Sequence, residues 1–164
     1  MPPNRDNQIY SDFAIQEHRQ RLFHANEDFL RGWDWEWIAH LTFPDSTNHH
    51  QINKSILNWF RQMQKRERIQ VASVYFICWR KGHPHIHALM LGQANRNKNN
   101  TNNLLDVDAS RWGKRWPHRA KVEPITSYFS AVRYVALHTL KLKCDEQETE
   151  VYNLKLLQRT CHPT

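Results

Sequence analysis

The sequence predicts an α+β fold in which a central antiparallel β-sheet is flanked by helices. Three observations support this fold class. Segments with helical and with strand periodicity follow one another in the order α β α β β α β α. The two consecutive strand segments are separated by a break too short for a crossover helix, so they are expected to pair as a hairpin. The chain has no internal repeat, and its 164 residues are enough for one domain with a substantial core.

The first part of the chain is expected to supply two helices and one strand. Residues 11–31 have helical periodicity, with Ser11 as the expected N-cap. Residues 36–43, EWIAHLTF, are typical of a strand and are followed by a Pro-Asp-Ser stop. Residues 53–68 are expected to be helical because apolar residues recur at spacings of three and four: Ile52, Ile56, Trp59, Phe60 and Met63.

The hairpin occupies the middle of the chain. Residues 70–80 are rich in β-branched and aromatic residues, and residues 85–92 form the returning strand. Lys81 and Gly82 are expected to form the tight turn between them. The Asn-rich segment 93–103 is expected to be a polar loop.

Three further elements are expected after this loop. Residues 108–116 are expected to form a short helix and residues 119–125 a fourth strand. Residues 126–141 are expected to form a helix capped by Thr126 or Ser127. The tail, residues 144–164, is polar, and its sequence predicts no element.

Charge is distributed unevenly and favours a polyanionic partner. Residues 51–143 carry 17 Lys and Arg against 4 Asp and Glu, a net charge of +13, whereas the whole chain carries +7. A basic segment that also contains Trp, Tyr and His is typical of a nucleic-acid-binding surface, and the alternative is a basic protein without such a partner. The basic residues form no amphipathic helix with a broad apolar face, so membrane binding is not expected.

Composition also bears on the compartment. No stretch approaches 18 consecutive apolar residues, and the N-terminal segment lacks the apolar core of a signal peptide. The three cysteines, Cys78, Cys144 and Cys161, include no CxxC pair, so we expect reduced thiols and a cytoplasmic location.

Two histidines of the returning strand are candidate metal ligands. Because alternate side chains of a strand share a face, His85 and His87 point the same way and Ile86 points to the other side. Cys78 is expected to lie across from His85, either as a third ligand or as a small buried apolar residue. The alternative for the two histidines is ordinary hydrogen bonding. His83, before Pro84, is expected to be exposed and closer to a phosphate than to a metal.

A second candidate group lies on the helix 126–141. Tyr134, His138 and Lys141 fall at i, i+4 and i+7, so they share one face. The apolar stripe is expected to comprise Phe129, Val132, Ala136 and Leu140. The alternative interpretation is an amphipathic helix whose polar face happens to contain a tyrosine.

Three motifs together resemble the HUH endonucleases, specifically the rolling-circle replication initiators, or Rep proteins, of plasmids and single-stranded DNA phages. HLTF (40–43) resembles the first motif of that family. GHPHIHAL (82–89) resembles the second and most specific motif, and YVALHTLK (134–141) resembles the third. The segment RWGKRW (111–116) is also similar, and the resemblance spans about residues 36–143. It implies an antiparallel sheet with flanking helices, related to the RNA-recognition fold.

The resemblance implies a metal-dependent, site-specific endonuclease of single-stranded DNA that starts rolling-circle replication. His85 and His87 would hold Mg²⁺ or Mn²⁺, and Tyr134 would attack the scissile phosphate and form a 5′-phosphotyrosine intermediate. Lys141 would supply a cation, and His138 stands where many relatives have a second tyrosine, which implies a single-tyrosine enzyme. The chain also departs from the family at Cys78, where a carboxylate ligand is common, and a thiolate there would favour Zn²⁺.

The expected partner is single-stranded DNA or an origin hairpin, with a host helicase and polymerase as further partners. The expected DNA-binding residues are basic residues near the motifs: Arg80, Lys81, His83, Arg111, Lys114, Arg115 and Arg133. Trp79 and Trp116 are expected either to stack on bases or to pack in the core. Three other functions stay open: a non-catalytic origin-binding relative, a single-tyrosine HUH transposase, and a zinc hydrolase or structural zinc protein.

Overall fold

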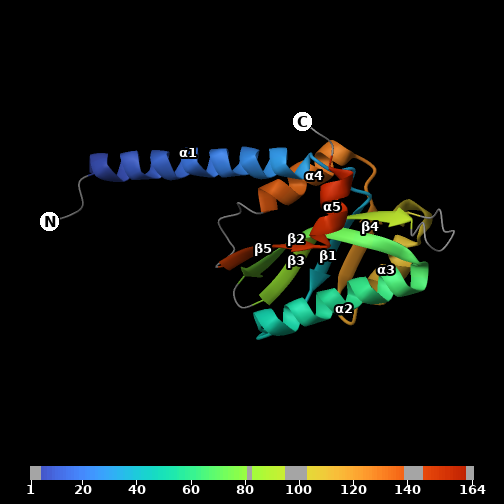
Figure 1. The fold of residues 1–164 in the computed structure, drawn as a ribbon. Coiled ribbons are helices and arrows are strands. Elements are labelled where there is room, and N and C mark those ends of the chain that lie inside the picture. The colour runs from blue at the N-terminus through green and yellow to red at the C-terminus, as the bar shows by residue number, and fades with distance from the viewer. Residues whose placement is uncertain (1–4, 81–82, 95–102, 139–145, 162–164) are drawn as a thin grey trace.

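The computed structural model describes residues 5–80, 83–94, 103–138 and 146–161, with the backbone alone at 5–14, 80, 94, 138 and 146–148. These residues form an α+β protein with a five-stranded antiparallel sheet packed against helices (Figure 1). The helices are α1 (Arg5–Leu30), α2 (His49–Glu67), η2 (Leu104–Asp106), α3 (Ala109–Lys114), α4 (Tyr128–His138) and α5 (Leu154–Thr160). The strands are β1 (Trp37–Thr42), β2 (Ile69–Arg80), β3 (His83–Ala94), β4 (Ala120–Pro124) and β5 (Glu146–Tyr152).

The strand order is β4-β1-β3-β2-β5. The predicted hairpin of β2 and β3 is confirmed, and its register runs from Ile69 opposite Ala94 to Arg80 opposite His83. The predicted turn at residues 81–82 lies outside the described residues. β1 lies between β3 and β4, so the strand of the first motif is bonded to two strands that come later in the chain.

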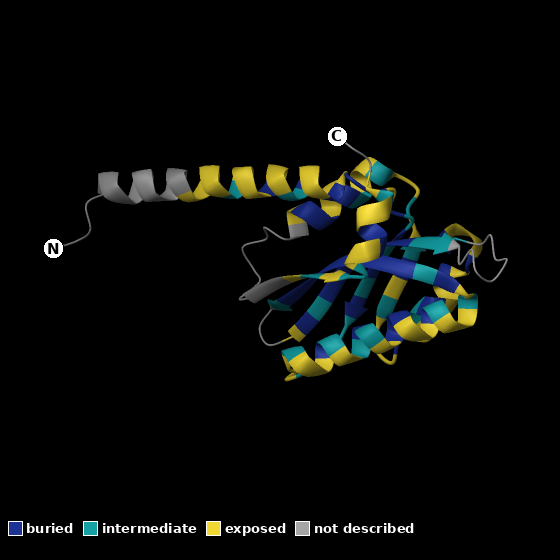
Figure 2. Cartoon of the chain, in the orientation of Figure 1, coloured by how far each residue is buried: buried dark blue, intermediate teal, exposed yellow. Residues whose placement is uncertain are grey.

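The sheet has helices on both faces, and two separate cores result. α2 and α3 lie on one side of the sheet, while α1, α4 and α5 lie on the other (Figure 1). The inner side of α2 is buried and its outer side is exposed (Figure 2). Among the described residues, no helix is long and apolar enough to cross a membrane.

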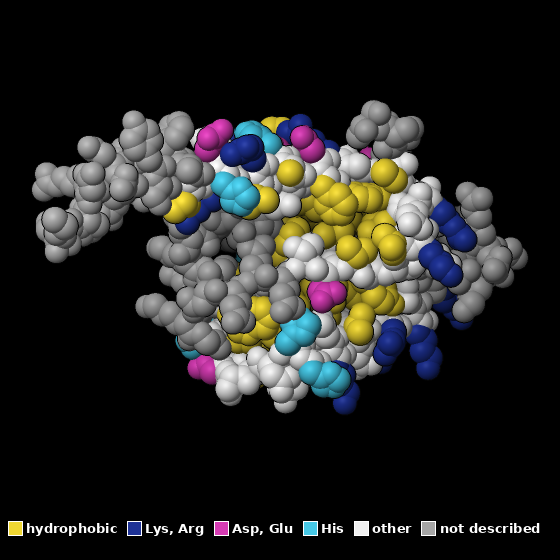
Figure 3. Space-filling model, turned by 60° about the vertical axis from the view of Figure 1, so that its left-hand side comes forward, with side chains coloured by type: hydrophobic (Ala, Val, Ile, Leu, Met, Phe, Trp, Pro, Cys, Tyr) yellow, Lys and Arg dark blue, Asp and Glu magenta, His cyan; other side chains and the backbone are white. Residues whose placement is uncertain are grey.

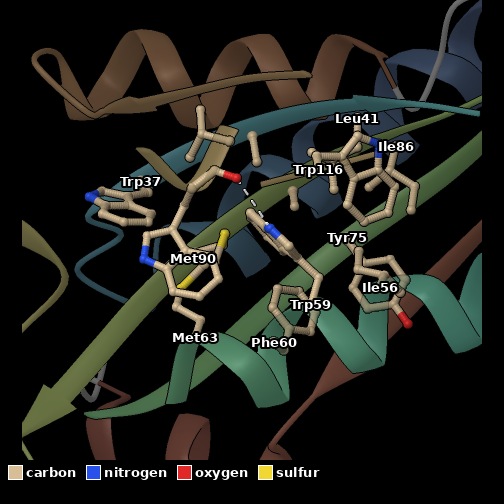
Figure 4. Close-up of a cluster of buried hydrophobic side chains, with 14 of the residues drawn as sticks. Trp37, Leu41, Ile56, Trp59, Phe60, Met63, Tyr75, Ile86, Met90 and Trp116 are labelled. Carbon is tan, nitrogen blue, oxygen red and sulfur yellow. Dashed lines mark hydrogen bonds between the residues drawn. The ribbon is translucent and has the colours of Figure 1, made fainter. Parts of the chain in front are cut away.

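Aromatic side chains dominate the core between the sheet and α2 (Figure 4). The rings of Trp112 and Trp116 both meet the ring of Trp59 edge to face, at centroid distances of 6.3 and 5.9 Å. The Trp59 indole donates to the Trp112 carbonyl oxygen at 3.3 Å, so the two polar groups are satisfied inside the core. Trp116 is 4% exposed and Trp79 is partly buried against the same core, which favours packing over base stacking for both.

Helix α2 begins earlier than predicted, at His49 instead of residue 53. Asn48 caps it, because its side chain accepts from the Gln51 amide while the Gln51 side chain accepts from the Asn48 amide. The helix ends at Arg68, which adopts the left-handed conformation. Helix α1 likewise begins at Arg5, so Ser11 lies inside the helix and is not its N-cap.

The polar tail contains two elements that the sequence did not predict. β5 pairs with β2 along the edge of the sheet, and α5 packs Leu156 and Leu157 into the core next to α1 and α4. Asn153 joins them: its side chain accepts from the Leu156 amide and donates to the Val71 carbonyl oxygen. β5 is an edge strand whose first five residues are all polar, so no apolar pattern marks it in the sequence.

Glu36 fixes the end of β3. One carboxylate oxygen accepts from the amides of Gly92 and Leu104, both at 3.0 Å. A Cβ at Gly92 would lie 2.8 Å from the Leu104 side chain, so only glycine fits this close approach. Burial raises the pKa of the Glu36 carboxyl above its usual value, and the two amides lower it in part.

Candidate active site

Three histidines lie on one face of the two central strands. In the register of β1 and β3, His40 is opposite His87 and Thr42 is opposite His85, and paired residues of antiparallel strands share a face. The prediction that His85 and His87 share a face is therefore confirmed. The Nδ1 atoms of His40 and His87 are 2.8 Å apart, and the ring centroids of His85 and His87 are 5.1 Å apart.

His40 belongs to this group although it was not among the predicted site residues. The signal was present in the sequence, because strand alternation in HLTF places His40 and Thr42 on the face opposite Leu41. Burial lowers the pKa of the His40 imidazole, and the Lys121 cation lowers it further. The lowered pKa favours the neutral imidazole, which is the form that binds a metal.

Cys78 lies where the hairpin geometry predicts, opposite His85 and 2% exposed, but it is disulfide-bonded. A disulfide sulfur offers no thiolate, so a metal-ligand role for Cys78 stays a prediction that requires the reduced cysteine. Zn²⁺ binding through a Cys78 thiolate would require the reduced cysteine in the same way. The expectation of reduced cysteines is wrong for Cys78, while Cys161 is free and exposed.

The histidines supply an incomplete ligand set for a divalent cation. Among the described residues, no three His, Cys, Asp or Glu side chains are arranged as a ready metal site. Two nitrogens bound at right angles to one ion lie about 3.0 Å apart if each bond is about 2.1 Å. The separation of 2.8 Å between His40 and His87 is close to this, so a small shift would suit a cation. Mg²⁺ and Mn²⁺ prefer oxygen, so either would need oxygen ligands from water or phosphate.

Tyr134 lies beside these histidines. Its ring meets the rings of His40 and His87 edge to face, at centroid distances of 5.4 and 6.0 Å, and the side chain is 41% exposed. Partial burial raises the pKa of the Tyr134 phenol, and the Lys121 cation acts in the opposite direction. Helix α4 is held in place by Val132, Val135 and Ala136, which are buried against the sheet.

The other residues predicted to share the helix face of Tyr134 are not described by the structure in full. His138 ends α4, but its side chain lies outside the described part of the chain, and so does Lys141. Phe129 is 52% exposed, so its assignment to the apolar stripe is wrong, whereas Val132 and Ala136 are buried as expected. Tyr128 faces away from the histidines, since its hydroxyl donates to the Trp33 carbonyl oxygen at 2.6 Å.

Two hollows meet at the histidines. We call the first the tyrosine groove: it runs between α4 and the β4–β1 edge of the sheet and has a volume of about 870 Å³. Its polar lining residues are His40, Thr42, Arg119, Lys121, Glu123, Thr126, Ser127, Ser130 and Tyr134. The second, of about 570 Å³, lies over the end of the hairpin and includes His83, His85 and His87. His40 and Thr42 line both, so an extended ligand would cross them at this point.

Most of the predicted DNA-binding cations lie away from the tyrosine groove. Arg111 pairs with the Glu67 carboxylate, and Arg115 lies over the Trp112 ring at 5.3 Å, both on the α2 side of the sheet. Lys114 lines a different hollow, beside β4. Arg133 lies over the rings of Phe23 and Phe129, at 5.7 and 5.9 Å, and so points toward α1.

The remaining predicted contacts are at the hairpin end. His83 lines the second hollow and pairs with the Asp45 carboxylate. Arg80 is opposite His83, but its side chain is not described, and Lys81 lies outside the described residues. The cations of the tyrosine groove are Arg119 and Lys121, which the sequence did not single out. Only the pairing of β4 with β1, which places Lys121 opposite His40, brings them there.

Comparison of the chain with protein-family models, with curated proteins and with solved structures gives no match.

Proposed function

We propose that this chain is a metal-dependent endonuclease that nicks and rejoins single-stranded DNA through Tyr134 and thereby initiates rolling-circle replication. The observation that carries the proposal is the contact of the Tyr134 ring with the imidazoles of His40 and His87. These residues come from the first, second and third motifs on which the resemblance to HUH Rep proteins rests. They are far apart in the sequence, and helix packing brings them together at one end of an open groove.

The reaction is a transesterification. The Tyr134 phenol oxygen attacks the phosphorus of a phosphodiester, loses its proton to solvent, and forms a P–O bond while the bond from phosphorus to the 3′ oxygen breaks. The leaving 3′ oxygen takes up a proton. The products are a 5′-phosphotyrosine and a free 3′-OH that primes synthesis, and attack by a 3′-OH in reverse rejoins the strand. A host polymerase and helicase would act on this product.

The histidines provide the metal-binding part of the proposed site. His85 and His87 would hold a divalent cation, with His40 as an additional nitrogen beside them. Such a cation, when bound, polarises the scissile phosphate and offsets the charge that develops on it. Thr42 lines both hollows next to the histidines. Its hydroxyl is fixed in position because it donates to the Arg119 carbonyl oxygen at 2.8 Å.

Lys121 is a further candidate for the cationic role that the resemblance assigns to Lys141. It lies in the tyrosine groove with Tyr134, and its charge acts on the Tyr134 phenol. Its present partner is Glu123, at 2.9 Å, in an exposed ion pair. Exposed pairs contribute about 0–1 kcal/mol, so a DNA phosphate can replace the carboxylate at little cost. His138 and Lys141 stay proposals as further catalytic residues.

The test is adduct formation. The chain is incubated with a single-stranded origin oligonucleotide and Mn²⁺, and the covalent product is identified by mass spectrometry. We expect an adduct on Tyr134 that is absent in Tyr134→Phe, while this variant still binds the oligonucleotide. Tyr128→Phe is the matched control on the same helix, and it keeps the adduct. An adduct in Tyr134→Phe would refute the assignment of the nucleophile.

A second candidate function is favoured by a separate observation. The disulfide at Cys78 suits a non-catalytic relative that recognises an origin hairpin, since it leaves no thiolate opposite His85. This alternative predicts salt-dependent DNA binding without cleavage in Mn²⁺, Mg²⁺ or Zn²⁺. Cleavage in any of the three would exclude it.

A single-tyrosine transposase has the same chemistry as the proposed endonuclease, and only the product of strand transfer between two DNA ends distinguishes it.

A further inference from the structure

A second basic surface lies far from the tyrosine groove. We call it the basic hollow: it has a volume of about 560 Å³ and lies between the C-terminal half of α2 and α5, over the start of β2. Four cations line it, Arg61 and Lys65 from α2 and Lys155 and Arg159 from α5, and no carboxylate does. Lys and Arg side chains gather at one end of the molecule, at the right of Figure 3, with no acidic side chain between them.

The placement of these cations costs stability in the absence of a partner. Arg61 and Lys65 are spaced i, i+4 on α2, and Lys155 and Arg159 have the same spacing on α5. Like charges at this spacing repel each other and destabilise a helix. Within the described part of the chain, none of the four forms an ion pair. Two such pairs facing one hollow are therefore expected to have a polyanionic ligand.

The floor of the basic hollow is rigid. The Gln64 side chain accepts from the Val71 amide at 2.9 Å and donates to the Tyr152 hydroxyl at 2.9 Å. The Asn153 side chain donates to the Val71 carbonyl oxygen at 3.1 Å. These bonds tie α2, β2 and the start of α5 together, so the two rows of cations keep a fixed separation and need little reorganisation to bind.

The lining distinguishes duplex from single-stranded DNA as the ligand. No aromatic side chain lines the basic hollow, whereas proteins that bind single strands stack the bases on aromatic rings. A surface of cations and amides suits a ligand that presents only its phosphates, as duplex DNA does. Gln70 lies six residues before Phe76, which is opposite His87, so the hollow is about 20 Å from the histidines along β2. This distance corresponds to about six base pairs of duplex.

We propose that the basic hollow binds the phosphate backbone of duplex DNA next to the single strand held in the tyrosine groove. The inference rests on the proposed function for the identity of the nucleic acid, but it concerns a surface that takes no part in the chemistry. A DNA hairpin would then contact the protein twice, with its stem at α2 and α5 and its unpaired strand at Tyr134.

The test uses a hairpin with a single-stranded extension, the blunt hairpin alone, and the single-stranded oligonucleotide alone. Affinity is measured over a range of salt concentrations for the full chain and for two double variants, Arg61→Gln with Lys65→Gln and Lys155→Gln with Arg159→Gln. The control, Lys54→Gln with Arg66→Gln, removes two exposed charges from α2 outside the hollow. Circular dichroism confirms that each variant is folded.

We expect each double variant to bind the blunt hairpin about tenfold more weakly, with a salt slope reduced by about 1.8, since each phosphate contact contributes about 0.9. The affinity for the single strand and the yield of its adduct with Tyr134 stay unchanged. In the control variant, the hairpin affinity, its salt slope, the single-strand affinity and the adduct yield all stay unchanged. Equal hairpin affinity and slope in the variants and the full chain overturn the inference. An equal loss for single strand and hairpin also overturns it.

Failure of the proposed function has a different signature. If the full chain forms no adduct, the endonuclease proposal fails, while a selective loss of hairpin binding in the two double variants still supports the basic hollow. If the full chain forms the adduct but does not bind the blunt hairpin, only the inference about duplex DNA fails.

Discussion

The two faces of the β-sheet differ most on β1 and β3. On the face toward α2, every residue of the two paired strands from Trp37 to Leu41 and from Ile86 to Met90 is apolar and buried. On the face toward α4, the first pair along β1 is apolar, with Ile38 opposite Leu89. The next two pairs are polar, with His40 opposite His87 and Thr42 opposite His85. The first face is a complete core, and the second changes from apolar to polar residues at the histidines beside Tyr134.

This difference indicates where stability and function lie. The side chains on the α2 face are apolar and buried, and they follow the alternation expected of a strand with one face in the core. Folding alone therefore explains them. Three imidazoles beside a tyrosine are not needed for packing, and their local conflict with the apolar pattern marks a candidate site. Changes on the two faces should therefore affect different measurements.

The largest expected effect is on the α2 face. Trp112 is fully buried, packs against Trp59, and donates from its indole to the Glu67 carboxylate at 2.8 Å. Trp112→Ala should lower the free energy of unfolding by about 3–5 kcal/mol, because it leaves a large cavity and removes one hydrogen bond from the buried side of the Glu67 carboxylate. Urea unfolding measures this loss, and Trp112→Phe should lose less. A folded Trp112→Ala protein with normal stability would contradict the assignment of this face to the core.

The next effect is on the α4 face. His87→Ala should reduce the rate of adduct formation on the order of 10²–10³-fold, as for removal of one transition-state contact. The free energy of unfolding should fall by less than about 1.5 kcal/mol, since one polar group and its hydrogen bond are lost. Single-turnover cleavage and urea unfolding are measured on the same protein. If stability falls sharply while cleavage is unchanged, the two faces have the same role.

A smaller effect is expected at the edge of the tyrosine groove. Lys121→Gln should slow adduct formation at saturating DNA by about tenfold, since one charge near the phosphate is lost. Lys121→Arg should restore most of the rate. Arg133→Gln, next to Tyr134 on α4 but directed toward α1, is the control and should leave the rate unchanged. Equal losses in both Gln variants would indicate a general charge effect and would remove Lys121 from the site.

The smallest effect is a pH dependence at Glu36, just before β1. Its pKa is raised in the folded protein, mainly by burial, so the folded state holds this proton to higher pH than the unfolded chain does. The resulting stability is present below pH 4.5 and is lost as pH rises through the raised pKa. Glu36→Gln should remove this part of the pH dependence in urea unfolding. An unchanged profile would mean that burial does not raise the pKa of Glu36 in the folded protein.

The sequence predicted the elements that have a strong local pattern. The alternation in the hairpin placed His85 and His87 on one face, and helical spacing placed Tyr134 on α4. It did not predict the pairing of β4 with β1 or of β5 with β2, because strand order depends on contacts between distant segments. Lys121, Arg119 and the four cations of the basic hollow were missed for this reason. The oxidation state of Cys78 also has no local signal.

The distribution of tryptophan has an optical consequence. None of the seven tryptophans lines the tyrosine groove, the hollow over the hairpin end or the basic hollow, and six of them are buried. Intrinsic fluorescence should therefore shift strongly when the core unfolds and change little when DNA binds. Emission from the Trp59–Trp112–Trp116 cluster then reports unfolding alone, so the stability of the protein can be followed in the presence of its ligand without a label.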